Sequence, residues 1–465
     1  MNLPQKFKEY AAEALTEQVS QLLFSKIDSS ESITSVRTNP IKMGEAPSAN
    51  GVPWCNNGYY LQERPVFTLD PAFHCGAYYV QEASSMYMQI VKNAIKEQEP
   101  QFWEQPIMAL DLCAAPGGKS THLLQLLGNE SILVSNEVIK SRCTILADNI
   151  AKWGYSNCIV TNNDPADFHK LKHRFNLIVV DAPCSGEGMS RKDSDAINEW
   201  SQENVKLCAA RSQRILSDIW DSLAPGGYLV FSTCTYNKYE NDNNLLFLQQ
   251  EFGAQIIPVP TDKDWRIITT PKGGLQFVPG LVKGEGQYMA IVRKSKDEEI
   301  LSGRGKEKKK DKKGGTGHFE KGCPFVPKGY VGEVMGELVK AYPEHLYTPI
   351  KEIEQHLKVV LSGVAVATKK GKDYIPYADL ALQNFISEQI QNNTLPKELV
   401  PVEVDIKEAL KFLAKEQLLF PDKPKGYLLL TYKGNGLGFV KNLGNRSNNL
   451  HPMARRIRMD ITSNL

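Results

Sequence analysis

The chain has 465 residues, of which 42% are hydrophobic and 23% are charged, and its net charge is +2. This length predicts about three domains, and the composition is that of a globular protein, which excludes wholesale disorder. A net charge this close to neutral means that any nucleic-acid surface must come from local clusters of basic residues.

Nowhere do 18 apolar residues run together, and the polar N-terminus lacks the apolar core of a signal peptide. The nine cysteines are scattered, without a C-x-x-C pair. This usage argues against a disulfide framework or a zinc site and is typical of a reducing compartment. We therefore expect a cytoplasmic protein that does not contact a membrane and holds no metal.

Between residues 106 and 294 short apolar runs alternate with helical stretches. Strands that are apolar throughout and joined by helices predict a parallel sheet covered on both faces, which is an α/β fold. The five predicted strands are IMALDLC, SILVSNEV, NCIVTNND, FNLIVVDAP and GGYLVFSTCT. The helix predicted over residues 204–223 has a buried stripe at Val205, Ala209, Ile215, Ile219 and Leu223.

The first of these strands leads into DLCAAPGGKS, which ends like a phosphate-binding P-loop. A P-loop needs a glycine five residues before Gly118, where this chain has Cys113, and the intervening Pro116 has no N–H to offer. The dinucleotide fingerprint also fails, because Gly117 and Gly118 are adjacent and no third glycine follows. The loop is tight and lets a ligand approach the backbone, but it is not built for pyrophosphate.

Polar residues and thiols stand at the carboxyl ends of all five strands, where ligands of such sheets bind. Taken singly, an acid there is commonly a turn or N-cap residue, and a cysteine is commonly a small buried hydrophobe. Five consecutive strand ends of this kind predict a site. The residues at these ends are Asp111, Glu137, Asp164, Asp181 with Cys184, and Ser232 with Cys234.

The chemistry of these groups points to a nucleoside ligand without phosphates. Glu137 is placed to bind a ribose diol and Asp164 an adenine amino group, which suggests S-adenosylmethionine. The carboxylate and amine of that cofactor would be held by the loop and by the first N–H groups of the following helix.

The two thiols point to attack on a weakly nucleophilic carbon. Carbon 5 of a pyrimidine becomes reactive only after a thiolate adds to carbon 6, which covalent catalysis by Cys184 or Cys234 would supply. Lys119 and the sulfonium of the cofactor are candidates for lowering the pKa of the thiol. Asp181 could accept from the amino group of cytosine and so select it over uracil.

The segments DLCAAPGGKS, VDAPCSGEGM and GGYLVFSTCT resemble the signature segments of the Sun-type (Nop/Sun) RNA cytosine-5 methyltransferases over residues 60–294. The resemblance implies a Rossmann-like S-adenosylmethionine-dependent methyltransferase domain. It assigns attack on the base to Cys234 and help in product release to Cys184, with Asp181 and Lys119 as further catalytic residues. It carries the cofactor contacts onto Cys113, Ala114, Ala115, Pro116, Gly117, Gly118, Lys119, Glu137, Asp164 and Asp181.

Segments on the N-terminal side of this domain extend the resemblance. SITSVRTNPIKM is similar to a strand of the family's small N-terminal RNA-binding module, with Arg37 as an expected phosphate contact. LDPAFHCGAYYVQEASSM resembles the segment that leads into the catalytic domain, as either an RNA contact or a packed aromatic connection.

The basic run RGKEKKKDKK, residues 304–313, is either a solvated linker or an arm that touches nucleic acid. The segment beginning GVAVATKKGK resembles the first C-terminal domain of bacterial RsmF-type members, and the stretch from residue 426 resembles their PUA-like RNA-binding module. That stretch predicts a hairpin turn at Lys-Gly-Asn-Gly, residues 433–436. Its expected RNA backbone contacts are Lys441, Arg446, Arg455, Arg456 and Arg458.

We therefore predict a monomeric enzyme that methylates carbon 5 of cytosine in ribosomal RNA, with the small-subunit RNA or the small ribosomal subunit as partner and no DNA. The alternatives are a tRNA cytosine-5 methyltransferase and a non-catalytic RNA-binding assembly factor; Cys234 disfavours a DNA methyltransferase. The predicted divisions are an N-terminal RNA-binding module with its connection (1–105), the catalytic domain (106–297), a basic linker (298–322), a first C-terminal domain (323–400) and a PUA-like α+β domain (401–465).

Overall fold

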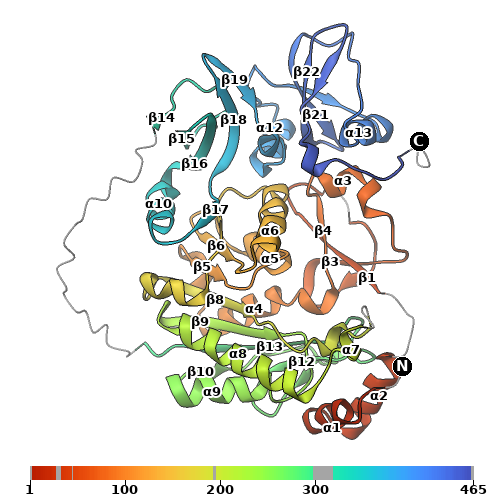
Figure 1. Ribbon diagram of the computed structural model, residues 1–465, viewed down its shortest axis with the longest axis vertical. Coiled ribbons are helices and arrows are strands. Elements are labelled where there is room, and N and C mark those ends of the chain that lie inside the picture. The colour runs from red at the N-terminus through yellow and green to blue at the C-terminus, as the bar shows by residue number, and fades with distance from the viewer. Residues whose placement is uncertain (1–2, 28–32, 44–45, 192–194, 297–317, 462–465) are drawn as a thin grey trace, which may run out of the picture.

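A computed structural model describes residues 3–27, 33–43, 46–191, 195–296 and 318–461 (Figure 1). The basic run at residues 304–313, predicted to be either a solvated linker or an arm that touches nucleic acid, lies outside the described residues. Within the described part of the chain, none of the helices combines the length and the apolar character that crossing a membrane requires.

The N-terminal part of the chain begins with the two helices α1 and α2 and continues into a small antiparallel sheet with the strand order β2-β3-β1-β4. Its helices pack against the catalytic domain, where Phe7 meets Trp200 edge-on at 5.6 Å between ring centres. The elements are α1 (Gln5–Ala14), α2 (Glu17–Ile27), β1 (Thr34–Thr38), β2 (Gly51–Val52), β3 (Cys55–Leu61), α3 (Pro71–His74), β4 (Tyr78–Val80) and α4 (Met88–Gln98).

The catalytic domain is built on a ten-stranded sheet whose path is β11-β12-β13-β9-β8-β5-β6-β7-β17, with β10 paired to β13. Neighbours from β7 to β9 along this path are parallel, and β13 runs antiparallel to β9. The chain progresses outward from β5 through β6 to β7 and then returns to β8 and β9, so the order reverses between β5 and β8. Ligands of such sheets bind at this switch point.

The strands of this sheet are β5 (Met108–Asp111), β6 (Ile132–Asn136), β7 (Cys158–Thr161), β8 (Phe175–Asp181), β9 (Leu223–Thr233), β10 (Gln255–Ile257), β11 (Ile268–Thr269), β12 (Leu275–Phe277) and β13 (Gln287–Arg293). The helices between them are α5 (Gly118–Leu126), α6 (Lys140–Trp153), α7 (Asp195–Asn198), α8 (Gln202–Trp220) and α9 (Asp242–Phe252). The five strands predicted from sequence are β5 to β9, so that prediction is confirmed.

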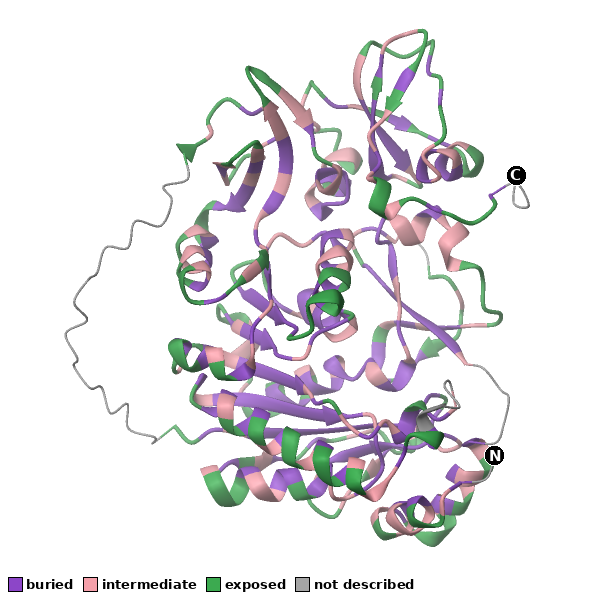
Figure 2. Ribbon diagram, in the orientation of Figure 1, coloured by how far each residue is buried: buried purple, intermediate pink, exposed green. Residues whose placement is uncertain are grey.

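Alternate residues of each central strand enter separate cores on the two faces of the sheet. Leu177 and Val179 pack with helices α4, α5 and α6, whereas Ile178 and Val180 pack with α8 and α9. Figure 2 shows this as buried strands between helices that are exposed only on their outer sides. The predicted coverage of both faces is therefore confirmed.

The predicted stripe on α8 is only partly correct. Val205, Ile215 and Ile219 are buried as expected, but Ala209 is half-buried. Leu223 is buried but begins β9, since the helix ends at Trp220. The rest of the buried face is made by Cys208, Ser212, Leu216 and Trp220.

The first C-terminal domain has a sheet with the order β14-β15-β16-β18-β19 and also lends elements to the catalytic domain. Strand β17 (Val359–Leu361) pairs antiparallel with β7, and Ile350 and Ile353 of α10 (Tyr347–His356) enter the same core as α8 and α9. The remaining elements are β14 (His318–Phe319), β15 (Tyr330–Met335), β16 (Leu338–Pro343), β18 (Val364–Lys370), β19 (Asp373–Pro376), α11 (Ala378–Ala381) and α12 (Asn384–Gln391).

The last domain has a four-stranded sheet with the order β20-β21-β22-β23 and helix α13 (Ile406–Leu413), whose first turn carries an Asp405–Glu408 capping box. The predicted hairpin is confirmed: β21 and β22 are joined by Lys433 and Gly434, both with positive φ, at 49° and 72°. Its strands are β20 (Val400–Glu403), β21 (Gly426–Tyr432), β22 (Asn435–Asn442) and β23 (Ser447–Asn449).

The parts of the chain meet at the C-terminal half of α6. The ammonium of Lys42 donates to the carbonyls of Cys75, Lys152 and Leu382 at 2.5–3.0 Å. Arg455 joins the last domain to the same region, because its guanidinium pairs with Asp148 of α6 at 2.5 Å and with Asp379 at 2.7 Å. The prediction that Arg455 contacts RNA is therefore wrong, whereas Lys441, Arg446, Arg456 and Arg458 are exposed.

Candidate active site at the switch point of the sheet

The loop between β5 and α5 is held from outside by side chains of its neighbours. Arg142 of α6 donates to the carbonyl of Ala115 at 2.9 Å, and Asn149 of the same helix and Tyr79 of β4 donate to that of Pro116 at 2.9 and 3.0 Å. Gly117 has a φ of 113°, which favours glycine, and immediately precedes α5. The first N–H groups of α5 have no partner within the helix, so they are available to an anionic group.

Arg37 is one of the groups that fix this loop. Its guanidinium is fully buried and donates to the carbonyl of Gly118 at 3.2 Å and to the hydroxyl of Thr121 at 2.5 Å. It also bonds to Gln81 and Gln125 and lies 4.8 Å from the centre of the Trp153 ring. The prediction of a phosphate contact at Arg37 is wrong, because no part of the side chain reaches the surface.

Asp111 lies at the base of the loop and was not among the predicted contacts. One of its oxygens accepts from Ser120 at 2.6 Å, while the other is buried without a hydrogen-bond partner among the described residues. Burial raises the pKa of this carboxyl to about 7. An unpaired buried acceptor costs about 1–3 kcal/mol. The loop therefore fits a ligand that brings positive charge, as the amine and sulfonium of S-adenosylmethionine do.

Two further predicted cofactor residues lie at the ends of the next strands. Glu137 is buried beyond β6, where it accepts from the N–H of Ile139 at 2.9 Å and pairs with Arg142 at 3.3 Å. Asp164 lies beyond β7 and caps the 3-10 turn after it by accepting from Ala166, with Arg214 at 3.5 Å. Asp164 thus has the capping role that the sequence left open as its alternative.

The small loop residues Ala114 and Ala115 are buried, while Cys113 is half-buried and burial raises the pKa of its thiol. The predicted contacts from Cys113 to Gly117 lie between Asp111 and α5, and Gly118 and Lys119 form the first turn of α5, on the edge of the sheet that carries Glu137 and Asp181.

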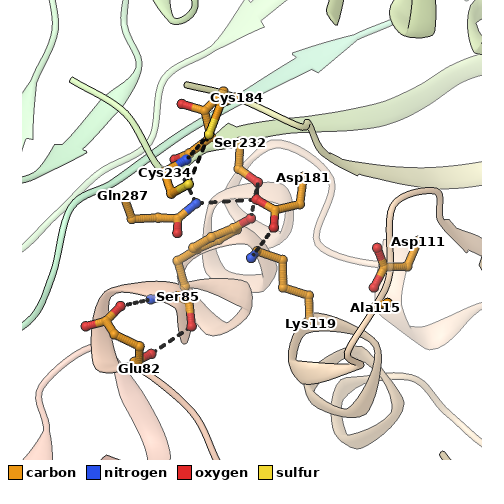
Figure 3. A network of polar contacts seen from close by, with 12 residues as sticks. Glu82, Ser85, Asp111, Ala115, Lys119, Asp181, Cys184, Ser232, Cys234 and Gln287 are labelled. Atoms are coloured by element: carbon orange, nitrogen blue, oxygen red, sulfur yellow. Dashed lines mark hydrogen bonds and ion pairs between the residues drawn. The ribbon is translucent and has the colours of Figure 1, made fainter. Parts of the chain in front are cut away.

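Asp181, at the end of β8, is the centre of a polar network (Figure 3). Lys119 of α5 donates to one oxygen at 2.8 Å, and Ser232 of β9 and Gln287 of β13 donate to the other at 2.6 and 3.5 Å. The hydroxyl of Tyr87 donates to Ser232 at 2.6 Å. Burial lowers the pKa of Lys119, but the Asp181 carboxylate outweighs this and raises it overall, so Lys119 is a stable cation paired with Asp181.

The two predicted thiols lie side by side above this network. The sulfur atoms of Cys184 and Cys234 are 3.0 Å apart, and the backbone N–H of Cys234 points to the sulfur of Cys184 at 3.3 Å. Both residues are half-buried. The hydrogen bond with Cys234, together with burial, raises the pKa of the Cys184 thiol well above its usual value.

The sequence placed Asp111 at the predicted rim but assigned it no contact, although it obeys the same strand-end rule as Glu137. Sequence reasoning missed Tyr87 and Gln287. Tyr87 precedes α4 and Gln287 begins the antiparallel strand β13, and no strand-end rule points to either position.

Three segments match known protein families. Residues 3–83 match the N-terminal domain of 16S rRNA methyltransferase RsmF, residues 99–293 match 16S rRNA methyltransferase RsmB/F, and residues 400–457 match the PUA domain of methyltransferase RsmF. The chain is 31% identical over 431 residues to ribosomal RNA small subunit methyltransferase F of Shewanella piezotolerans, covering 86% of this chain and 84% of that protein. It is 29% identical over 455 residues to the protein of the same name from Salmonella agona, covering 90% and 89%.

Solved structures share the fold. A methyltransferase homologue from Pyrococcus horikoshii superposes with a TM-score of 0.52 at 24% identity, covering 63% of this chain and 95% of that chain. NSun6 from the same organism, solved with SFG, gives 0.51 at 19% identity, covering 63% and 99%. These likenesses support the methyltransferase fold of the central domain.

Proposed function

Since the chain belongs to the RsmF family of ribosomal RNA small subunit methyltransferases, we propose that it methylates carbon 5 of a cytosine in 16S ribosomal RNA. The observation that carries this proposal is the pair of thiols 3.0 Å apart at the ends of β8 and β9, beside the Lys119–Asp181 pair. Transfer to an oxygen or an amine needs no thiol, whereas carbon 5 of a pyrimidine does, because only an adduct at carbon 6 makes it nucleophilic.

Cys234 is the proposed nucleophile. Its sulfur bonds to carbon 6, the electrons of the 5,6 double bond move to carbon 5, and carbon 5 takes the methyl group. A base then removes the proton of carbon 5, the double bond re-forms, and Cys234 leaves as a thiolate. The resemblance to the RNA cytosine-5 methyltransferases assigns attack to Cys234 and help in product release to Cys184, whose sulfur lies 3.0 Å from that of Cys234.

Asp181 and Lys119 are the proposed groups that orient the base. A carboxylate accepts about four hydrogen bonds, so Asp181 retains capacity for the amino group of cytosine beside its bonds from Lys119, Ser232 and Gln287. Uracil has no donor at that position, so this contact would select cytosine. Lys119 holds one oxygen of this carboxylate by a hydrogen bond of 2.8 Å.

S-adenosylmethionine, the methyl donor of this methyltransferase family, supplies an electrophilic methyl group when bound. Residues 113–119 would surround its amino-acid part at the N-terminus of α5, Glu137 would accept from its ribose, and Asp164 from its adenine. Asp111 would balance its positive charge with the oxygen that has no partner in the described part of the chain.

The RNA substrate rests on the last domain and on the relatives. The curated relatives that match most of the chain carry the name ribosomal RNA small subunit methyltransferase F, and residues 400–457 match the PUA domain of RsmF. Exposed Lys441, Arg446, Arg456 and Arg458 are the proposed contacts to the RNA backbone. The target base would leave its stack to reach Cys234.

The roles of the thiols are tested by incubating single variants with substrate RNA and S-adenosylmethionine. Cys234→Ala should abolish methylation, while Cys184→Ala should accumulate a protein–RNA adduct that survives denaturing electrophoresis. Cys323→Ala, which removes a buried thiol of the first C-terminal domain, should behave as the unmodified protein does. Adducts from Cys234→Ala and none from Cys184→Ala would reverse the assignment.

The substrate is tested by bisulfite sequencing of total RNA from a strain that lacks the gene. A cytosine of 16S ribosomal RNA should lose its mark and regain it when the gene is restored. Loss of a mark in tRNA instead would favour the tRNA alternative, and an unchanged pattern would favour the assembly factor.

A further inference from the structure

Two buried carboxylates lie behind the thiols, and neither is used by the chemistry above. Glu187 follows Cys184 by three residues and is 3% exposed, and Glu240 follows Cys234 by six residues and is fully buried. Each carboxylate accepts hydrogen bonds from the segment that carries the other cysteine. Each segment that carries a cysteine is therefore hydrogen-bonded to the carboxylate of the other segment, and we call this arrangement of Glu187 and Glu240 the clasp.

Glu187 accepts hydrogen bonds from the segment that follows Cys234. One oxygen accepts from the hydroxyl of Thr235 at 2.5 Å and from the N–H groups of Tyr236 and Asn237 at 2.8 and 3.1 Å. The other accepts from the side-chain amide of Asn237 and from the indole of Trp200, both at 2.9 Å. Five donors converge on this group, which suits a carboxylate and not an amide, since an amide would place its own N–H groups against donors.

Glu240 accepts hydrogen bonds from the segment that follows Cys184. Its oxygens accept from the backbone N–H of Ser185 at 2.9 Å and from the hydroxyl of Ser185 at 2.5 Å, and the amide of Asn237 donates at 2.8 Å. Asn237 thus bridges both carboxylates. Two further contacts close the clasp: the N–H of Gly188 donates to the carbonyl of Cys234 at 2.8 Å, and the hydroxyls of Ser185 and Thr235 lie 3.3 Å apart.

We propose that Glu187 and Glu240 are positioning residues that hold the sulfur atoms of Cys184 and Cys234 at their working separation. The inference rests on the proposed roles of the two thiols in methyl transfer. Cys184 and Cys234 follow adjacent parallel strands, and strand pairing stops at Asp181 and Ser232. Beyond that point the crossed carboxylates tie the two segments together, alongside the contacts of Gly188 with Cys234 and of Ser185 with Thr235.

The donors to both carboxylates are neutral hydroxyl, amide, indole and backbone groups. Burial raises the pKa of Glu240 to about 7 and the nearby Glu187 adds to the shift, although the hydrogen bonds from Ser185 and Asn237 lower it. A glutamate that served only to stabilise the fold would not lose folding free energy when it ionises. Glu240→Gln should leave the protein folded at pH 8 and at the temperature of the assay, while it slows methylation.

The separation of the thiols can be measured without methylation, because a trivalent arsenical such as phenylarsine oxide binds two thiols only when they lie close together. Mass spectrometry should show one equivalent on the full-length protein and none at this pair in Cys234→Ala. Capture should be at least about tenfold slower in Glu187→Gln and Glu240→Gln, and single-turnover methylation should fall between about tenfold and a hundredfold, as displacements near 1 Å do. Binding of S-adenosylmethionine should stay unchanged.

Asp242→Asn is the matched control, since Asp242 is a buried carboxylate in the same domain that accepts from Thr270, Lys272 and Tyr288 instead of the cysteine segments. It should capture the arsenical as the unmodified protein does. Normal capture and normal methylation in both glutamate variants would overturn the proposal. So would a fall in thermal midpoint at pH 8 that accounts for the lost activity of Glu240→Gln. Arsenical capture that depends on both glutamates, in a protein that makes no 5-methylcytosine, would refute the proposed function and keep the clasp.

Discussion

Replacing Arg37 by methionine separates two roles that an arginine in an RNA-binding module can have. The structure places its guanidinium in the interior, where it donates to Gly118, Thr121, Gln81 and Gln125. Burial lowers its pKa to about 10, so the group is still charged at pH 7. A hydrogen bond to a charged group contributes about 1.5–3 kcal/mol, and each buried partner left unsatisfied costs about 1–3 kcal/mol.

We therefore expect Arg37→Met to lose at least about 3 kcal/mol of unfolding free energy, a large share of the roughly 5–15 kcal/mol typical of folded proteins. Urea titration followed by fluorescence measures this loss. Because Gly118 begins α5, the affinity for S-adenosylmethionine, measured by calorimetry, should also fall.

The control is Arg446→Met, which changes an exposed arginine of the last domain. That variant should keep its unfolding free energy and lose RNA affinity, with the salt dependence of binding reduced by about one ion. If Arg37→Met instead gave normal stability and the smaller salt slope, Arg37 would be a phosphate contact and its burial in the structure would be incorrect.

Three more outcomes are expected. Asp181→Asn leaves Lys119 without its anionic partner and should lower single-turnover methylation by about thirtyfold or more, corresponding to about 2 kcal/mol; an unchanged rate would contradict the role of the pair. Burial raises the pKa of Asp111 and Glu240 to about 7. Their stabilising contribution is therefore complete below about pH 4 and is lost as the pH rises through 7, on the order of 3 kcal/mol for each group. The thermal midpoint should fall less steeply over this range in Glu240→Gln than in the unmodified protein, and an equal slope would count against the shifted pKa. Arg455→Met leaves Asp148 and Asp379 without their shared cation and should expose the segment after residue 450 to proteolysis, whereas Arg456→Met, at an exposed position, should not.

The parts of the site that follow from the sequence are those fixed by local pattern and sheet topology. Apolar runs of strand length located β5 to β9, and the parallel order places Glu137, Asp181, Cys184 and Cys234 at one edge without knowledge of any side-chain contact. The paired thiols needed only the rule that adjacent strands end side by side.

Contacts between distant parts of the chain were beyond such rules. Arg455 pairs with a residue 307 positions away, and no short pattern distinguishes it from Arg456, which is exposed. Arg37 lies in a strand of which all five residues are buried. The alternation of buried and exposed side chains that would show the charge of Arg37 to point inward is therefore missing. Strand β17 joins the catalytic sheet from more than 60 residues beyond β13, and its three residues carry too little pattern to predict a partner.

Helix α6 connects the C-terminal domains with the loop between β5 and α5. Its side chains Arg142 and Asn149 hold the loop at Ala115 and Pro116, and its Asp148 receives Arg455 from the last domain. Strand β17 pairs with β7, which directly follows this helix, so the first C-terminal domain is joined to the same sheet. Because packed helices and paired strands do not slide independently, the last domain stands at a set distance from Cys234. On the proposed function, the cytosine within reach of Cys234 is therefore selected by this packing and not by the length of the chain between the catalytic and C-terminal domains.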